Sequence, residues 1–193
     1  IKKNKDWLFP NVRYGVGSNK YISVGDAILG DLPSLKSDQE KTEYLSSPKN
    51  SYQNYLRKNS KNLLNHKSPN HPKETILKIQ NTKPGEPMYP KFKQRIRLNK
   101  NNLSPTQICG GIRPQFQFGH PTQSRGLTIR ERARIQSFPD NFLFFGGIVQ
   151  GRVQTGNAVP PLLAKELASQ LINHFNGKKI FGIKAENYQI ELF

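Results

Sequence analysis

Cys109 is the only cysteine of this 193-residue chain, and its thiolate would be the most reactive nucleophile the sequence offers. It stands between Gln107-Ile108 and Gly110-Gly111. A single cysteine cannot form an internal disulfide, and it excludes a zinc site built from cysteines. Free cysteine also packs well as a small apolar side chain. We expect Cys109 to have this packing role rather than a catalytic one.

Arginine and glutamine side chains in the middle of the chain could read DNA bases. Arginine pairs bidentately with guanine in the major groove, and glutamine can pair with adenine. The candidates are Arg95, Arg97, Gln107 and Arg113. Arg113 follows Gly110-Gly111, so a flexible loop can carry it to the groove floor. For each candidate the alternative is a phosphate contact, which positions the protein without specifying a base.

The formal charge of +17 comes from 30 Lys and Arg against 13 acidic residues. Ten of the basic residues lie between Lys91 and Arg134, with Glu131 as the one acid in that range. Phosphates attract clustered cations, and binding releases condensed counterions. The charge therefore favours a nucleic-acid partner over a merely solubilising surface. For Arg132 and Arg134, solvation and a phosphate contact both stay open.

The histidines do not suggest a metal site. His66 and His71 lie five residues apart in a stretch rich in Asn and Pro, without further metal ligands beside them. His120 is followed by Pro121, and we expect it to make a structural hydrogen bond.

Short elements must position these side chains. Residues 23–28 predict a short helix after a strand end, with Pro33 as its boundary. Residues 36–90 are rich in Lys, Asn, Ser and Pro, a composition that could indicate disorder. The spaced tyrosines of that stretch favour a short helix from Ser51 to Arg57. Residues 92–98 alternate apolar and polar, which predicts a half-buried strand, with 106–109 as the returning strand.

The clearest helix signals lie in the last third of the chain. Thr128 and Glu131 have the spacing of a capping box, which predicts a helix over 129–137. We assign the pair Arg130 and Glu131 to helix capping and local ion pairing rather than to an active site. A second helix begins at Pro160-Pro161.

This C-terminal helix carries an apolar stripe that must pack against another surface. Its leucines repeat every four residues, at Leu163, Leu167 and Leu171, and Phe175 continues the row. Gly177 is a plausible C-terminal cap.

Two segments resemble the last two sequence motifs of cytosine-5 DNA methyltransferases. The first is Arg125-Gly126-Leu127-Thr128-Ile129-Arg130-Glu131-Arg132-Ala133-Arg134-Ile135-Gln136-Ser137-Phe138-Pro139-Asp140, and the second is Gln154-Thr155-Gly156-Asn157-Ala158-Val159-Pro160-Pro161-Leu162-Leu163-Ala164. Residues 23–28, 104–106 and 120–121 also look like family features. The resemblance spans nearly the whole chain, although residues 36–90 match only loosely.

In that family a large α/β domain binds S-adenosylmethionine and holds the nucleophilic cysteine in a Pro-Cys pair. A small domain reads double-stranded DNA, and a final helix returns to the large domain. This sequence has no Phe-x-Gly-x-Gly loop, no Pro-Cys-Gln and no Glu-Asn-Val. The resemblance therefore implies no catalytic residue here, since no proline precedes Cys109. It implies cofactor contacts for Asn157, Ala158 and Val159, with helix capping as the alternative for Asn157.

The expected fold class is α+β. Residues 1–35 would end the connection from the catalytic domain, and residues 36–140 would form a small mixed target-recognition domain with short strands and loops. Residues 141–193 would form the returning segment, whose helix docks on a catalytic domain or subunit outside this chain. The chain begins with Ile1 rather than Met, which leads us to expect a piece of a longer protein or a trimmed form of one.

The resemblance implies the recognition part of a bacterial cytosine-5 DNA methyltransferase, of the kind found in restriction-modification systems. Such enzymes rotate the target cytosine out of the duplex. We expect the part to be inactive alone, and a non-catalytic DNA-binding module is the alternative. No signature of an RNA-binding domain supports a third possibility. No apolar run reaches membrane-spanning length and no signal-peptide stretch follows the charged first residues, so we expect a cytoplasmic protein.

Overall fold

The structure is a computed structural model that describes residues 8–11, 14, 20–109, 116–178 and 182. The chain divides into two compact units, residues 22–158 and residues 1–21 with 159–193. The first unit thus contains the predicted recognition segment 36–140 together with its flanks on both sides. No helix of the described residues is long and apolar enough to cross a membrane.

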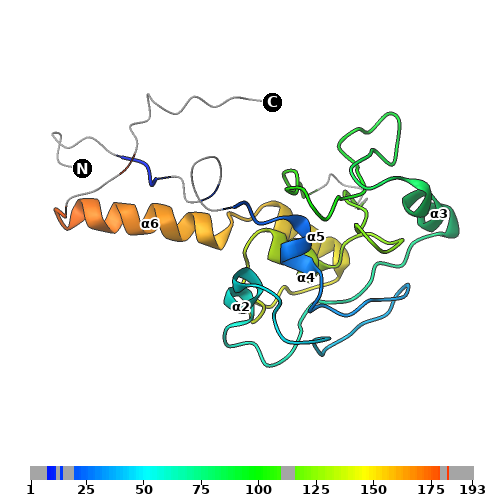
Figure 1. The fold of residues 1–193 in the computed structure, drawn as a ribbon, viewed down its shortest axis with the longest axis horizontal. Helices are drawn as coiled ribbons and strands as arrows, with labels where there is room; N and C mark the ends of the chain where they lie inside the picture. The colour runs from blue at the N-terminus through cyan, green and yellow to red at the C-terminus, as the bar shows by residue number, and fades with distance from the viewer. Residues whose placement is uncertain (1–7, 12–13, 15–19, 110–115, 179–181, 183–193) are drawn as a thin grey trace. The chain divides into compact units, whose positions relative to one another are not determined.

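In the part of the unit 22–158 that the structure describes there are five short helices, drawn in Figure 1. They are α1 (Val24–Ile28), α2 (Ser51–Arg57), α3 (Lys73–Asn81), α4 (Ile129–Ile135) and α5 (Ile148–Gly156). Helices of this length are marginal alone in water, so packing must stabilise them. α4 packs against α1 and α5, and α1 also contacts α2.

Side-chain caps mark the helices that the sequence predicted. Ser23 and Asp26 form a capping box at α1, and Asn50 caps α2 with its side chain. Thr128 and Glu131 form the predicted capping box at α4, which ends at Ile135, two residues earlier than predicted.

The helices α3 and α5 were not predicted. α3 follows Pro72 and α5 follows Gly147, and neither has a side-chain cap. They therefore lack the side-chain cap that marks the start of α1, α2 and α4.

The predicted strand pair is not formed. Within 92–98 only two isolated bridges occur, Ile96 with Pro87 and Arg97 with Gly119. Residues 106–108 instead bond to a side chain. The amide of Gln117 donates to the Thr106 carbonyl at 2.9 Å and accepts from the Ile108 N–H at 3.0 Å. A side chain thus satisfies backbone groups that a returning strand would have paired.

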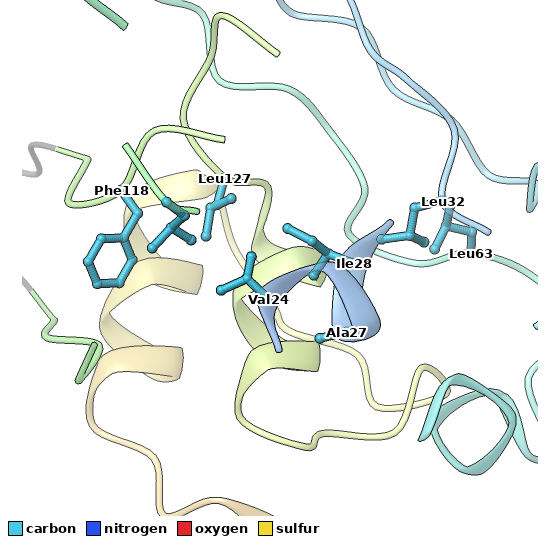
Figure 2. Close-up of a cluster of buried hydrophobic side chains, with 8 residues drawn as sticks. Val24, Ala27, Ile28, Leu32, Leu63, Phe118 and Leu127 are labelled. Carbon is cyan, nitrogen blue, oxygen red and sulfur yellow. The ribbon is translucent and has the colours of Figure 1, made fainter. Parts of the chain in front are cut away.

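The core of this unit gathers apolar side chains from α1 and from segments far along the chain, as Figure 2 shows. Its buried members are Val24, Ala27, Ile28, Leu32, Leu63, Leu98, Phe118 and Leu127. Burying one such aliphatic or aromatic side chain contributes roughly 1.5–3 kcal/mol. A second cluster packs Ile129 and Ala133 of α4 against Phe138 and Phe144.

The other unit contains α6 (Pro161–Phe175), which begins at the predicted prolines. Gly177 follows its end with a φ of 67°, the left-handed conformation expected of a C-terminal cap. The side chains of Leu163, Leu171 and Phe175 are 52%, 42% and 67% exposed. The amide of Gln170 donates to the Leu8 carbonyl at 3.2 Å.

Candidate nucleic-acid interface

Helix α4 is the charged centre of the unit formed by residues 22–158. Its polar side chains Arg130, Glu131, Arg132 and Arg134 are all buried, with exposures of 0–3%. The expectation that Arg132 and Arg134 face solvent or phosphate is therefore wrong. Buried charges need paired and hydrogen-bonded partners, and each of these side chains has them.

Arg134 lies between two buried carboxylates. Its guanidinium donates to Asp31 at 2.7 and 2.9 Å and to Asp140 at 2.6 and 3.0 Å. Burial alone would lower the pKa of Arg134, but the hydrogen bonds to Asp31 and Asp140 raise it above its ordinary value. The Tyr44 hydroxyl donates to Asp140 at 2.9 Å, and burial together with that carboxylate raises the pKa of Tyr44 to about 12.

Glu131 joins the cap of α4 to the chain before it. Its carboxylate accepts the Thr128 N–H at 2.8 Å and both terminal nitrogens of Arg125 at 2.7 and 2.8 Å. Burial would raise the pKa of Glu131, but attraction to Arg125 and His120 holds it well below the ordinary value. Thr128 and Glu131 thus form the cap of α4, and Glu131 also pairs with Arg125.

Arg130 has the predicted structural role as well. Its guanidinium donates to the carbonyls of Leu64, Pro139 and Phe142 at 2.8, 3.1 and 2.6 Å. These bonds fix the loop on either side of Asp140 against the residues before His66.

Arg132 links α4 to the end of α5. It donates to the Thr155 hydroxyl at 2.9 Å and to the Ile108 carbonyl at 3.1 Å, and burial lowers its pKa to about 10. A side chain at Gly156 would overlap the backbone of Cys109, so the glycine permits this close approach. We expected the Cys109 side chain to pack as a small apolar group, and the structure shows it only partly buried.

The segment 157–159 follows this anchored end of α5. Asn157 is its C-cap residue, with its N–H donating to the Val153 carbonyl at 3.0 Å and its side chain exposed. Ala158 packs against the second apolar cluster, whereas Val159 is 61% exposed. The side chains of Asn157 and Val159 are thus accessible to a ligand, as a cofactor contact requires, and Ala158 serves packing.

Two of the predicted base-contacting residues are engaged inside the fold. Arg97 donates to the carbonyls of Ile79, Gln80, Thr82 and His120 at 3.0–3.3 Å, at the C-terminal end of α3. Gln107 is buried, and its amide donates to the Arg132 carbonyl at 2.8 Å. This corrects the expectation for both, because neither side chain is presented to a DNA groove.

The other two candidates have different outcomes. Arg113 lies outside the described residues. Arg95 is half-buried, with its guanidinium 4.5 Å from the Phe92 ring centre and 5.8 Å from that of Tyr89. It lines a cavity of about 510 Å³ together with Arg152 of α5. Arg152 was missed by the sequence analysis, since its helix had no local signal.

Three histidines are held neutral by their surroundings. His120 accepts the N–H groups of Thr122 and Gln123 at 3.2 and 3.0 Å, as the expected structural hydrogen bond, and burial lowers its pKa to about 4. Burial also lowers the pKa of His66 and brings that of His71 to about 4. Within the described part of the chain, no group of three or more His, Cys, Asp or Glu residues could hold a metal ion.

These histidines make the stability of the protein depend on pH. Each pKa is lower in the folded than in the unfolded chain, so the unfolded chain binds more protons as the pH falls below about 6.5. We expect the free energy of unfolding to decrease as the pH falls from 6.5 to about 4, by about 1.4 kcal/mol per pH unit for each of His71 and His120. The lowered pKa of His66 acts in the same direction. Urea unfolding at several pH values measures this slope. His120→Asn keeps an acceptor but cannot titrate, so it should flatten the slope; equal stability of the wild type at pH 7 and pH 5 would contradict the expectation.

Residues 10–173 match the sequence model of the family described as C-5 cytosine-specific DNA methylase. Type II methyltransferase M.DdeI of Desulfomicrobium norvegicum is 33% identical over 184 residues, covering 81% of this chain and 44% of that protein. Type II methyltransferase M1.HphI of Haemophilus parahaemolyticus is 33% identical, covering 79% of this chain and 37% of that protein. A crystal structure described as a prophage-encoded DNA modification methyltransferase of E. coli superposes with a TM-score of 0.62 at 25% identity, covering 81% of this chain and 48% of that one. The chain thus spans less than half the length of these relatives.

Proposed function

Because the chain belongs to the C-5 cytosine-specific DNA methylase family, we propose that it is the DNA-recognition and cofactor-pocket-completing part of a type II DNA (cytosine-5-)-methyltransferase. Members of this family use S-adenosylmethionine as methyl donor. One observation carries the proposal: the chain holds the two motif segments 125–140 and 154–164, but no Pro-Cys pair and no Phe-x-Gly-x-Gly loop. The nucleophile must then come from a catalytic domain that these residues do not include.

Helices α4 and α5 support the cofactor part of the proposal. The bond from Arg132 to Thr155 and the close approach of Gly156 to Cys109 fix the end of α5. They hold Asn157 at a defined position, with a side-chain amide that offers both donor and acceptor. S-adenosylmethionine, when bound, would supply the methyl group, and Asn157 and Val159 would contact it at the edge of the pocket.

Exposed lysines support the DNA part. The arginines of α4 serve the fold, so phosphates must be bound by exposed cations, and we place this contact in residues 83–100. Lys83, Lys91, Lys93 and Lys100 are exposed there, and Arg95 is half-buried. We therefore assign the binding of DNA phosphates to this lysine-rich segment, residues 83–100, rather than to the whole basic range 91–134. By binding the phosphates of both strands, this segment would help to offset the few kcal/mol that it costs to rotate a cytosine out of the duplex.

The apolar row on α6 supports a docking role. Leu163, Leu171 and Phe175 are exposed and lie on one face with Leu167 by helical spacing. An apolar patch of this kind usually marks an interface. We assign it to the catalytic domain, because docking there would deliver the neighbouring Asn157 to the cofactor.

Methyl transfer to duplex DNA tests the proposal. We expect the purified chain to incorporate no labelled methyl from S-adenosylmethionine, because the family's nucleophile is missing. Adding the segment of the same genome that carries the Pro-Cys pair should restore incorporation. Binding of duplex DNA by the chain should weaken steeply between low and moderate salt, since phosphate neutralisation releases counterions.

Three outcomes would count against parts of the proposal. Methyl incorporation by the chain alone, abolished by Cys109→Ser, would show a complete enzyme. Duplex binding without any restoration of methyl transfer would favour the alternative of a non-catalytic DNA-binding module. Affinity that does not depend on salt would show that the lysines are not its source.

A further inference from the structure

We propose that the cavity lined by Arg95, Arg152 and a set of aromatic rings binds one unstacked nucleotide of the DNA, with the rings against the base and Arg95 toward the phosphate. The inference rests on the proposed function and adds a second DNA contact to it. The cavity of about 510 Å³ falls within the roughly 300–1,000 Å³ of small-ligand sites. The proposed function places the target cytosine at the nucleophile of the catalytic domain, so the nucleotide held in this cavity would be a second one.

The aromatic lining comes from three separate segments of the chain. Tyr89 and Phe92 come from the lysine-rich segment, and Phe116 and His71 come from two others, with their ring centres 4.5 Å apart at an angle of 52°. Every base has a π-face that stacks on such rings regardless of sequence. A paired base inside a duplex has both faces covered by its neighbours, so the site selects a nucleotide that has left the stack.

His71 contributes a neutral ring at physiological pH. Its Nε2 accepts the Gly126 N–H at 3.0 Å, and burial together with Arg152 and Arg125 lowers its pKa to about 4. The imidazole therefore offers a flat, uncharged face next to Phe116.

The charge of the lining favours an anion beside the base. Its charged members are the guanidiniums of Arg95 and Arg152. Arg95 lies 4.5 Å from the centre of the Phe92 ring, so the cation and the stacking surface stand together. A guanidinium pairs with two phosphate oxygens at once, and a nucleotide presents its phosphate close to its base.

The surroundings indicate DNA rather than a free nucleotide as the source. Lys91 and Lys93 are exposed on either side of Phe92, and Lys78 lies 4.3 Å from the centre of the Tyr89 ring. Proteins that bind single strands combine cations, which contact successive phosphates, with aromatic rings that stack on the bases. The lysines beside this aromatic cavity fit that combination. A free nucleotide would use only the cavity itself.

Fluorescence anisotropy with two labelled duplexes tests the proposal on the full chain. One duplex is fully paired and the other carries a single unpaired thymidine. We expect about tenfold tighter binding of the second duplex, the effect of stacking one base. Phe92→Leu and Arg95→Gln should each reduce this preference to twofold or less. Phe145→Leu and Lys61→Gln are matched controls at exposed positions outside the cavity, and they should retain the preference.

The possible results separate the cavity from the proposed function. A wild-type chain that binds paired DNA with salt dependence but shows no preference for the unpaired thymidine overturns the cavity proposal alone. Equal loss of preference in Phe145→Leu also overturns it. Millimolar deoxythymidine monophosphate should compete for the cavity and reduce the preference, because it carries the same base and phosphate; a preference that it leaves unchanged counts against the cavity as the site. Failure to bind either duplex overturns the proposed function. Thermal unfolding of Phe92→Leu, whose ring is 43% exposed, verifies that this variant is folded.

Discussion

Replacing Arg134 by methionine should lower the free energy of unfolding by about 3–5 kcal/mol, because it removes one partner from a buried cluster of ion pairs. The guanidinium is fully buried and lies between Asp31 and Asp140, which are themselves fully buried. Removing the cation leaves two carboxylates without their compensating charge. Urea unfolding of the variant measures the loss, and Lys61→Met is the control at an exposed position.

A triple substitution distinguishes the two ways in which Arg134 could act. If the loss comes from uncompensated charge, changing Asp31 and Asp140 to leucine together with Arg134→Met should recover much of the stability, because apolar replacement of a buried cluster is often neutral. If the triple variant is as unstable as the single one, the bond of Arg134 to the Ala27 carbonyl, or the loss of the carboxylates that Tyr44, Arg130 and Arg57 contact, accounts for the instability rather than uncompensated charge. A single variant within 1 kcal/mol or so of the wild type would contradict the expectation altogether.

Changing Leu167 and Leu171 to aspartate should abolish the restoration of methyl transfer by the catalytic domain. Two charges on the apolar row of α6 would have to be desolvated at the interface, where even a single residue can account for at least about 2 kcal/mol of binding. We expect restored activity to fall at least about a hundredfold, while DNA binding changes less than about twofold. Labelled methyl incorporation at increasing concentrations of the catalytic domain measures the first quantity, and anisotropy with duplex DNA measures the second.

The matched control for this variant lies on the opposite face of the same helix. Ser169→Asp with Asn173→Asp adds the same charge, and helical spacing places both positions away from the leucine row. It should leave the restoration intact. Normal restoration by Leu167→Asp with Leu171→Asp would mean that α6 does not dock through this face, and the two-part proposal would lose its physical join.

The sequence by itself determined the features that depend on neighbouring residues. The capping-box spacing of Thr128 and Glu131 predicted α4. The spaced tyrosines predicted α2, and the stretch 23–28 with its boundary at Pro33 predicted α1. The prolines before α6 and the glycine after it marked its ends in the same way. The motif segments 125–140 and 154–164 also indicated the family from residue order alone, and the family match over residues 10–173 confirmed it.

Tertiary structure alone decided which charged side chains face the solvent. Arg134 is buried against Asp31, which lies 103 residues away in the sequence. Gln107 is buried against a carbonyl 25 residues away. The predicted strand at 106–109 was lost in the same manner, since the Gln117 side chain takes its backbone hydrogen bonds. Composition and spacing carry no information about such distant partners. For that reason the sequence left Arg132 and Arg134 open between solvation and a phosphate contact, whereas the fold buries both side chains. Exposed lysines such as Lys91 and Lys93 carry positive charge at the surface instead.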